Sequence, residues 1–174
     1  SGANHRLTMH GIDESIPFKP VRIAILTVSD TRTLANDRSG DVLAERITTS
    51  GHTLVAREII EDDVAKLTPT LTAWIGRSDI DVVITTGGTG ISRRDGTFEV
   101  VSTLIDKRID GFGELFRALS FEEIGPSAML SRACAGTARG KILISLPGSK
   151  NAVRLGVTRL VLPELGHLVR EVTR

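Results

Sequence analysis

The feature that most constrains the fold is an alternation of short apolar runs with segments of helical periodicity. Residues 21–28 (VRIAILTV) are rich in β-branched side chains and nearly continuous in apolar character. Such a run is typical of a parallel strand covered on both faces, whereas a strand with one solvated face alternates apolar and polar residues. We therefore expect a central strand of a parallel sheet here.

The rest of the chain continues this alternation. Further strands are predicted at 53–60, 81–86, 133–138 and 141–146. Helices are predicted at 39–49 with Ser39 as cap, from Asp62 or Asp63 to Gly76, from Thr97, at 112–121, around 127–130, and over 149–173 with a break or kink at Pro163. Arg139-Gly140 is typical of a hairpin turn. The predicted fold class is α/β, a three-layer α/β/α sandwich with a mostly parallel central sheet and a short antiparallel edge hairpin.

The length of 174 residues fits one domain. We expect a single α/β domain over 19–174, preceded by a polar, flexible tail over 1–18. Ser1-Gly2-Ala3 resembles the remnant of an expression tag, and Met9 is a candidate native start.

The charge and cysteine content exclude some classes of protein. The 22 basic and 21 acidic side chains nearly cancel, and only 3% of residues are aromatic, which disfavours nucleic-acid binding. Cys134 is the only cysteine, so no intramolecular disulfide is possible. No apolar stretch approaches the length of a membrane span. We expect a cytoplasmic protein with no nucleic-acid or membrane partner.

Polar residues follow each strand that we expect to be parallel. Because the carboxyl ends of such strands meet at one edge of the sheet, these turns should converge on a single site. The turns are Ser29-Asp30, Glu61-Asp62-Asp63, Gly87-Gly88-Thr89-Gly90 and Pro147-Gly148-Ser149. The glycine-rich turn allows backbone N–H groups to approach an anion without side-chain obstruction, which indicates a phosphate-bearing ligand.

Each turn also has a purely structural interpretation. A Gly-Gly-x-Gly turn is often only a tight connection, and this one matches neither the Walker A motif nor the dinucleotide-binding motif. Asp62 or Asp63 could cap a helix, as could Asp95, and Ser149 could merely start the last helix. Ser29-Asp30 could be an ordinary turn pair.

The functional interpretation follows from the chemistry of phosphoryl and nucleotidyl transfer. Such reactions need magnesium held by one or two carboxylates and hydrogen-bond donors around the phosphate oxygens. Asp62 and Asp95 can supply the carboxylates. The glycine turn and the start of the helix at Ser149 can supply backbone donors.

An ordered series of motifs resembles the MoaB/MogA family of molybdenum cofactor biosynthesis proteins, and the MoaB branch in particular. The resemblance covers Lys19 to the C-terminus. The motifs are Thr27-Val28-Ser29-Asp30, Ser39-Gly40, Thr86-Gly87-Gly88-Thr89-Gly90 with Asp95, Gly111-Phe112-Gly113-Glu114, Phe116-Arg117, Ser120 to Gly125, Ser131-Arg132-Ala133 and Leu146-Pro147-Gly148-Ser149. A series of this length in one order is more specific than any single motif.

The resemblance implies a molybdopterin adenylyltransferase, which converts Mg-ATP and molybdopterin to adenylyl-molybdopterin and pyrophosphate. Asp62 and Asp95 match the two functional aspartates of the family, which the resemblance implies as catalytic residues, with one or both of them as magnesium ligands. The implied substrate-binding residues are Ser29, Asp30, Gly40, Thr86, Gly87, Gly88, Thr89, Gly90, Ser131, Arg132, Pro147, Gly148 and Ser149. Arg132 could neutralise phosphate charge, or could instead bind a helix C-terminus or a neighbouring subunit.

The family also implies a homotrimer or homohexamer and a hand-over of product to a molybdate-insertion enzyme. The helix that contains Phe112 and Phe116 could pack in the core or serve oligomer contacts. The main alternative is a molybdopterin-binding or carrier protein without adenylyltransferase turnover. Molybdate insertion and a scaffolding module are further alternatives, although both would require additional domains.

Overall fold

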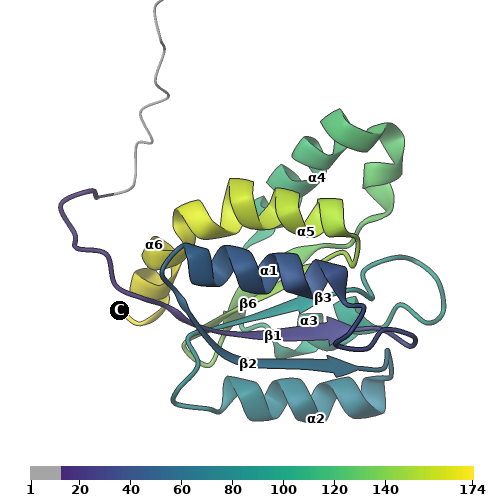
Figure 1. The fold of residues 1–174 in the computed structure, drawn as a ribbon, viewed down its shortest axis with the longest axis horizontal. Helices are drawn as coiled ribbons and strands as arrows, with labels where there is room; N and C mark the ends of the chain where they lie inside the picture. Colours follow the sequence, from purple (N-terminus) through teal and green to yellow (C-terminus); the bar gives the residue numbers. More distant parts are fainter. Residues whose placement is uncertain (1–12) are drawn as a thin grey trace, which may run out of the picture.

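A six-stranded sheet with helices on both faces forms the centre of the protein (Figure 1). The computed structural model describes residues 13–174. The strand order is β2-β1-β3-β6-β5-β4, and the strands are β1 (Arg22–Val28), β2 (Thr53–Ile60), β3 (Val82–Thr86), β4 (Lys107–Arg108), β5 (Cys134–Ala138) and β6 (Lys141–Leu146). This arrangement confirms the predicted α/β sandwich.

The sheet is parallel through β2, β1, β3 and β6, and antiparallel at the other edge. The β5–β6 hairpin is confirmed, and its turn has Arg139 and Gly140 at φ values of 48° and 78°. Two successive positive φ values match the twist of the flanking strands. The short strand β4, which pairs with β5, was not predicted, because its two residues are exposed and carry no apolar pattern.

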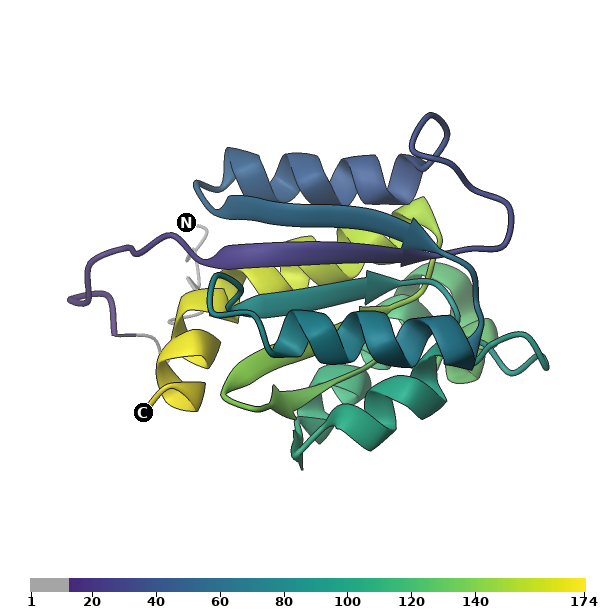
Figure 2. The ribbon, with the colours of Figure 1, turned by 90° about the horizontal axis from the view of Figure 1, so that it is seen from below.

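Two layers of helices cover the two faces of the sheet. Figure 1 shows α1 and α5 above the sheet and α2 below it, and Figure 2 shows the face that α2 and α3 cover. The helices are α1 (Arg38–Thr49), α2 (Val64–Ile75), α3 (Thr97–Leu104), α4 (Asp110–Ile124), α5 (Lys150–Gly156) and α6 (Leu162–Val172), with a 3₁₀ helix over Gly125–Leu130.

The two faces of each inner strand bury alternate residues against these layers. Ile23 and Ile25 pack in the core with helices α1, α4, α5 and α6. Ala24 and Leu26 pack in the second core with α2 and α3. Phe116 is 1% exposed in the first core, which confirms the core interpretation for that side of α4.

The observed N-caps of the helices show that one predicted cap was wrong and decide two cases that the sequence left open. Asp37, not Ser39, is the N-cap of α1, because its side chain accepts the N–H of Gly40. Asp63 caps α2 by accepting the N–H of Ala65, so Asp62 is free of that role. Asp95 does not cap α3, whose N-cap is Gly96 and has no side-chain hydrogen bond.

The predicted break at Pro163 is confirmed. A π-helical turn over Val157–Val161 separates α5 from α6, and Pro163 lies in the first turn of α6. Proline has no N–H to donate to a carbonyl in the preceding turn, so the regular α-helical pattern is interrupted upstream of it.

The first part of the chain is described only from Asp13 onward, so most of the tail predicted for 1–18 lies outside the described residues. Within the described part, the ring of Phe18 contacts that of His52 at 5.2 Å between centroids. Across residues 13–174, no helix has the length and apolar character that a membrane span requires.

The connections place a candidate site between β1 and β3. The chain leaves β1 through α1 toward β2 on one side, and returns through α2 to β3 on the other side of β1. The two helices cover opposite faces of the sheet. The carboxyl ends of strands at such a reversal are where α/β sheets bind ligands.

Candidate functional site

The four polar turns predicted to converge do so. The N–H of Gly87 donates to the carbonyl oxygen of Leu146 at 2.9 Å, which ties the glycine turn to the end of β6. A Cβ built on Gly148 would lie 3.2 Å from the Cα of Gly87. The N–H of Asp62 donates to Oδ1 of Asp30 at 3.1 Å, which joins the ends of β1 and β2.

The glycine turn has a backbone that only glycine adopts without strain. Gly87 and Gly88 have φ values of 94° and 71°. A Cβ on Gly87 would collide with the carbonyl oxygen of Val28. A Cβ on Gly88 would lie 2.8 Å from Oδ2 of Asp62 and closer still to the hydroxyl of Thr97. The glycines therefore permit both the turn and the close approach of Asp62.

The two sides of this turn have different hydrogen-bond partners. The carbonyl oxygens of Thr89 and Gly90 accept hydrogen bonds of 2.9 Å from the backbone N–H and from Nε of Arg132. Within residues 13–174, the N–H groups of Gly88, Thr89 and Gly90 have no protein acceptor. These three donors are available to an anion, as the sequence predicted for a phosphate-binding turn.

Asp62 lies against the far end of the same loop. Its Oδ1 accepts the N–H of Gly96 at 3.1 Å, and its Oδ2 has no protein donor within the described residues. Burial raises the pKa of Asp62 above its usual range, and the charges of Asp95 and Asp30 add to this effect, while the hydrogen bond from Gly96 opposes it.

Asp95 is held inside its own loop. Its Oδ2 accepts hydrogen bonds from the backbone N–H of Ser92 at 2.9 Å and from the Ser92 hydroxyl at 2.6 Å. The same oxygen would lie 2.7 Å from a Cβ on Gly90. The second carboxylate oxygen has no protein donor in the described part of the chain.

The residues present fit a magnesium ion that is bound together with substrate. Asp62 and Asp95 each keep one carboxylate oxygen without a protein donor, and the buried Thr97 hydroxyl beside Gly88 also lacks a hydrogen-bond partner within residues 13–174. In that same part of the chain, no group of three or more His, Cys, Asp or Glu side chains could hold a metal ion. Magnesium commonly uses one or two carboxylates and completes its shell with water and substrate phosphates.

Asp30 forms a bidentate ion pair across the site. Its Oδ1 and Oδ2 lie 2.7 and 3.0 Å from Nη2 and Nε of Arg94. The guanidinium holds the pKa of Asp30 below its usual range. Because Arg94 belongs to the segment between the glycine turn and α3, the pair joins this segment to the end of β1.

The guanidinium of Arg132 is bound by groups of the protein itself, and neither interpretation of the sequence included these partners. Its Nε donates to the carbonyl oxygen of Gly90, and its Nη2 donates to that of Asp95 at 3.0 Å. Its Nη1 pairs with Glu99, and the guanidinium stacks 4.8 Å from the ring centroid of Phe98. Arg132 therefore fixes the shape of the loop over Gly90 to Asp95.

Several predicted hydroxyl groups also hold turns in place. Oγ of Ser29 accepts the N–H groups of Thr31 and Arg32, and Oγ of Ser131 accepts that of Ala133. Ser149 is the N-cap of α5, which matches its structural interpretation. Pro147 is partly exposed beside it, while Thr86 is fully buried.

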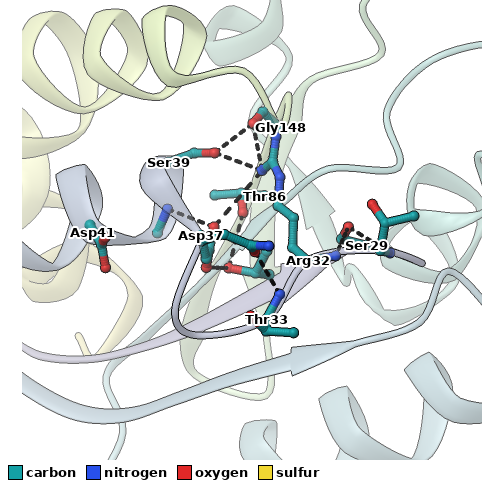
Figure 3. Close-up of polar contacts among 12 residues, drawn as sticks. Ser29, Arg32, Thr33, Asp37, Ser39, Asp41, Thr86 and Gly148 are labelled. Atoms are coloured by element: carbon teal, nitrogen blue, oxygen red, sulfur yellow. Dashed lines mark hydrogen bonds and ion pairs between the residues drawn. The ribbon is translucent and has the colours of Figure 1, made fainter.

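A buried ion pair network behind the site was not predicted (Figure 3). The carboxylate of Asp37 is 0% exposed and accepts the Thr27 hydroxyl at 2.6 Å and the N–H of Gly40 at 3.0 Å. Nitrogens of Arg57 and Arg32 lie 3.4 and 3.8 Å from its oxygens. Gly40, which was predicted to bind substrate, is buried, and its N–H is taken up by Asp37. An aspartate directly before a predicted helix is a recognisable cap signal, whereas its pairing with Arg57 of β2 is not visible in the sequence.

Comparisons with known proteins identify the family of the chain. A family described as “Probable molybdopterin binding domain” matches residues 24–167. The chain belongs to this family. Its matched region contains every candidate site residue from Ser29 to Ser149.

Proteins and solved structures that are similar to this chain match most of its length. “Molybdenum cofactor biosynthesis protein B” of Bacillus anthracis is 52% identical over 157 residues, which are 90% of this chain and 93% of that protein. A crystal structure of a “Molybdenum cofactor biosynthesis protein B” superposes with a TM-score of 0.86 at 51% identity, over 88% of this chain and 96% of the other. “Tungsten cofactor synthesizing protein MoaB from Pyrococcus furiosus” has a TM-score of 0.81 at 38% identity, over 91% of this chain and all of its own.

Proposed function

We propose that this member of the MoaB/MogA family adenylylates molybdopterin with Mg-ATP, releasing pyrophosphate, as a step in molybdenum cofactor biosynthesis. One observation carries the proposal. Within residues 13–174, the glycine turn presents three N–H donors without a protein acceptor between two carboxylates, Asp62 and Asp95, that each keep one oxygen without a protein donor. This combination is what binding of a metal-bound polyphosphate requires.

The residues of the site would bind and orient the reactants. The N–H groups of Gly88, Thr89 and Gly90 would donate to phosphate oxygens, which aligns the α-phosphate of ATP with the attacking phosphate oxygen of molybdopterin. Asp62 and Asp95 would hold magnesium, which neutralises charge on the phosphates when it is bound. The new bond joins the terminal phosphate of molybdopterin to the α-phosphorus, and pyrophosphate leaves. The protein therefore needs no nucleophile of its own.

The relatives support a role in cofactor biosynthesis. All three carry names that refer to molybdenum or tungsten cofactor synthesis, and they are similar to this chain over about nine tenths of its length. A shared fold alone would not imply a shared reaction, so the proposal depends on the Asp62, Asp95 and glycine-turn geometry.

The test is a turnover assay with purified protein, molybdopterin, ATP and magnesium, in which adenylyl-molybdopterin and pyrophosphate are both measured. We expect product from the wild type, and a loss of about 100-fold or more in Asp62→Asn and Asp95→Asn, because each substitution removes a negative charge that would hold magnesium against the phosphates. Circular dichroism checks that the variants fold. Tight binding of molybdopterin without any adenylylated product would favour the carrier alternative.

We also propose that the protein assembles into a homotrimer or homohexamer in the cytoplasm and passes its product to a molybdate-insertion enzyme. Large apolar side chains on α4 and the adjoining 3₁₀ helix support the assembly, since an exposed apolar surface is typical of an interface. These side chains are Leu115, Phe121, Ile124, Met129 and Leu130, which are 48–74% exposed. Cys134 is buried and unpaired, which agrees with a reducing compartment.

A further inference from the structure

Two arginines that flank the glycine turn already have carboxylate partners. Arg132 pairs with Glu99 and donates to the carbonyl oxygens of Gly90 and Asp95. Arg94 forms a bidentate pair with Asp30. A phosphate at the turn would therefore have to compete with a protein carboxylate for either guanidinium.

Arg32 is placed differently, with one edge of its guanidinium fixed by neutral oxygens. Its Nη1 donates to the Ser39 hydroxyl at 2.7 Å and to the carbonyl oxygen of Gly148 at 2.9 Å (Figure 3). The nearest carboxylate oxygen that pairs with it belongs to Asp37 at 3.8 Å, which is beyond hydrogen-bond distance. The orientation of the group is thus set without a carboxylate taking up its donors.

The other edge of the guanidinium faces solvent beside the turn. Among residues 13–174, Nε and Nη2 of Arg32 have no acceptor, and the side chain is 35% exposed. Nη1 lies 3.8 Å from a Cβ built on Gly148, and that Cβ lies 3.2 Å from the Cα of Gly87. Nε and one N–H of Nη2 point in the same direction in a planar guanidinium, which is the fork that matches two oxygens of a phosphate.

We propose that Arg32 binds the phosphoryl group of a substrate through this free edge, at the border between the glycine turn and the Pro147-Gly148-Ser149 turn. The inference rests on the proposed function, because it names a further substrate contact of the same site. Both ATP and molybdopterin carry phosphate, so the ligand chemistry is a phosphate oxygen and the source has to be distinguished by experiment. Because Ser39 and Gly148 already hold Nη1, less side-chain conformational entropy is lost when a phosphate binds.

The experiment measures equilibrium binding by isothermal titration calorimetry to wild type, Arg32→Gln, Arg32→Lys and Arg57→Gln. Arg57→Gln is the matched control, because Arg57 contacts the same Asp37 carboxylate and carries the same charge, but donates to Asp37 and Asp41 instead of Gly148. The ligands are Mg-ATP, inorganic pyrophosphate, molybdopterin and, as a ligand without phosphate, adenosine.

We expect Arg32→Gln to weaken binding of one or more of the phosphate ligands by about 10- to 100-fold, as for the loss of a charge-assisted hydrogen bond. Adenosine binding and the Arg57→Gln variant should be unchanged. A loss confined to Mg-ATP and pyrophosphate assigns the contact to the nucleotide, and a loss confined to molybdopterin assigns it to the pterin phosphate. Arg32→Lys keeps the charge beside Asp37 but lacks the fork, so it should show a smaller loss of affinity. It replaces Arg32→Gln in the test if that variant does not fold.

Three results would overturn the inference. The first is that Arg32→Gln binds every phosphate ligand with wild-type affinity. The second is an equal loss of affinity in Arg57→Gln, which would mean that the loss comes from disturbing Asp37. The third is that the wild type binds none of the phosphate ligands. Binding that depends on Arg32 in a protein that shows no turnover would support the inference while contradicting the proposed adenylylation, so the two failures can be told apart.

Discussion

The carboxylate of Asp62 accepts a 3.1 Å hydrogen bond from the backbone N–H of Gly96, which lies 34 positions later in the chain. This contact joins the end of β2 to the start of α3 across the glycine turn. The position of the carboxylate and the shape of the loop are therefore coupled, and a change in either should alter the other.

Substitution of Gly88 tests this coupling. A Cβ at Gly88 would meet both the Thr97 hydroxyl and the Asp62 carboxylate, and the backbone has a φ of 71°. We expect Gly88→Ala to lower the free energy of unfolding by about 1–3 kcal/mol, measured by urea denaturation, and to abolish nucleotide binding. Gly111 in α4 has nothing within 4 Å of a built Cβ, so Gly111→Ala is the control and should be neutral or stabilising. Equal effects at the two positions would contradict the coupling.

The pH dependence of stability tests the environment of Asp62. Burial and the nearby charges of Asp95 and Asp30 raise the pKa of Asp62 above the ordinary value of 3.8. In the folded protein the group keeps its proton at a pH where the unfolded chain has lost it. Its ionisation therefore costs stability above the folded pKa and costs nothing below the unfolded pKa.

Asp62→Asn removes that cost, so we expect it to melt at a higher temperature than wild type at pH 7. The difference should shrink as the pH falls through the folded pKa and vanish below about 3.8, the unfolded value. Thermal melts between pH 3 and 8 measure this, with Asp63→Ala as a variant of the neighbouring residue that should instead be destabilised at pH 7 because it removes the side chain that caps α2. A lower melting temperature of Asp62→Asn at pH 7 would show that its hydrogen bond to Gly96 outweighs burial.

We expect Arg132 to stabilise the loop over Gly90 to Asp95 and not to neutralise phosphate charge. Its bonds to the carbonyl oxygens of Gly90 and Asp95 are lost in Arg132→Gln. We expect a decrease of about 1–3 kcal/mol in the free energy of unfolding and faster amide hydrogen exchange over 88–96. Arg108 also lies over the ring of Phe98, at 5.9 Å, and pairs with exposed Asp110, so Arg108→Gln is the control and should change stability by about 0.5 kcal/mol or less. Unchanged exchange in Arg132→Gln would refute the assignment.

The apolar surface of α4 tests the proposed assembly. Phe121 is 58% exposed, so a charged residue there would be solvated in a monomer but buried in an interface. We expect Phe121→Glu to shift the sedimentation of the protein toward the monomer. Leu34 is 59% exposed on the loop before α1, and Leu34→Glu should leave the assembly intact. A wild type that sediments as a monomer would end this proposal.

Much of the architecture was predictable because local patterns are strong where strands are buried. The run 21–28 was expected to be a central strand, and β1 lies between β2 and β3 with its residues buried on both faces. The Arg139-Gly140 hairpin was also predictable, since Gly140 can adopt the positive φ that such a turn requires. The strand β4 was not, because its two exposed residues carry no apolar pattern and are recognised as a strand only by their pairing with β5.

The chain itself determined which turns converge as a candidate site, because glycines, aspartates and serines after buried strands limit what the backbone can do there. The tertiary structure decided what each side chain does, because hydrogen-bond partners come from segments far apart in sequence. Asp63 caps a helix while Asp62 faces the glycine turn, and Arg132 holds a loop while Arg32 keeps an open edge. Residue type and spacing are the same before and after folding, but the partners that compete for each donor and charge exist only once the strands are aligned.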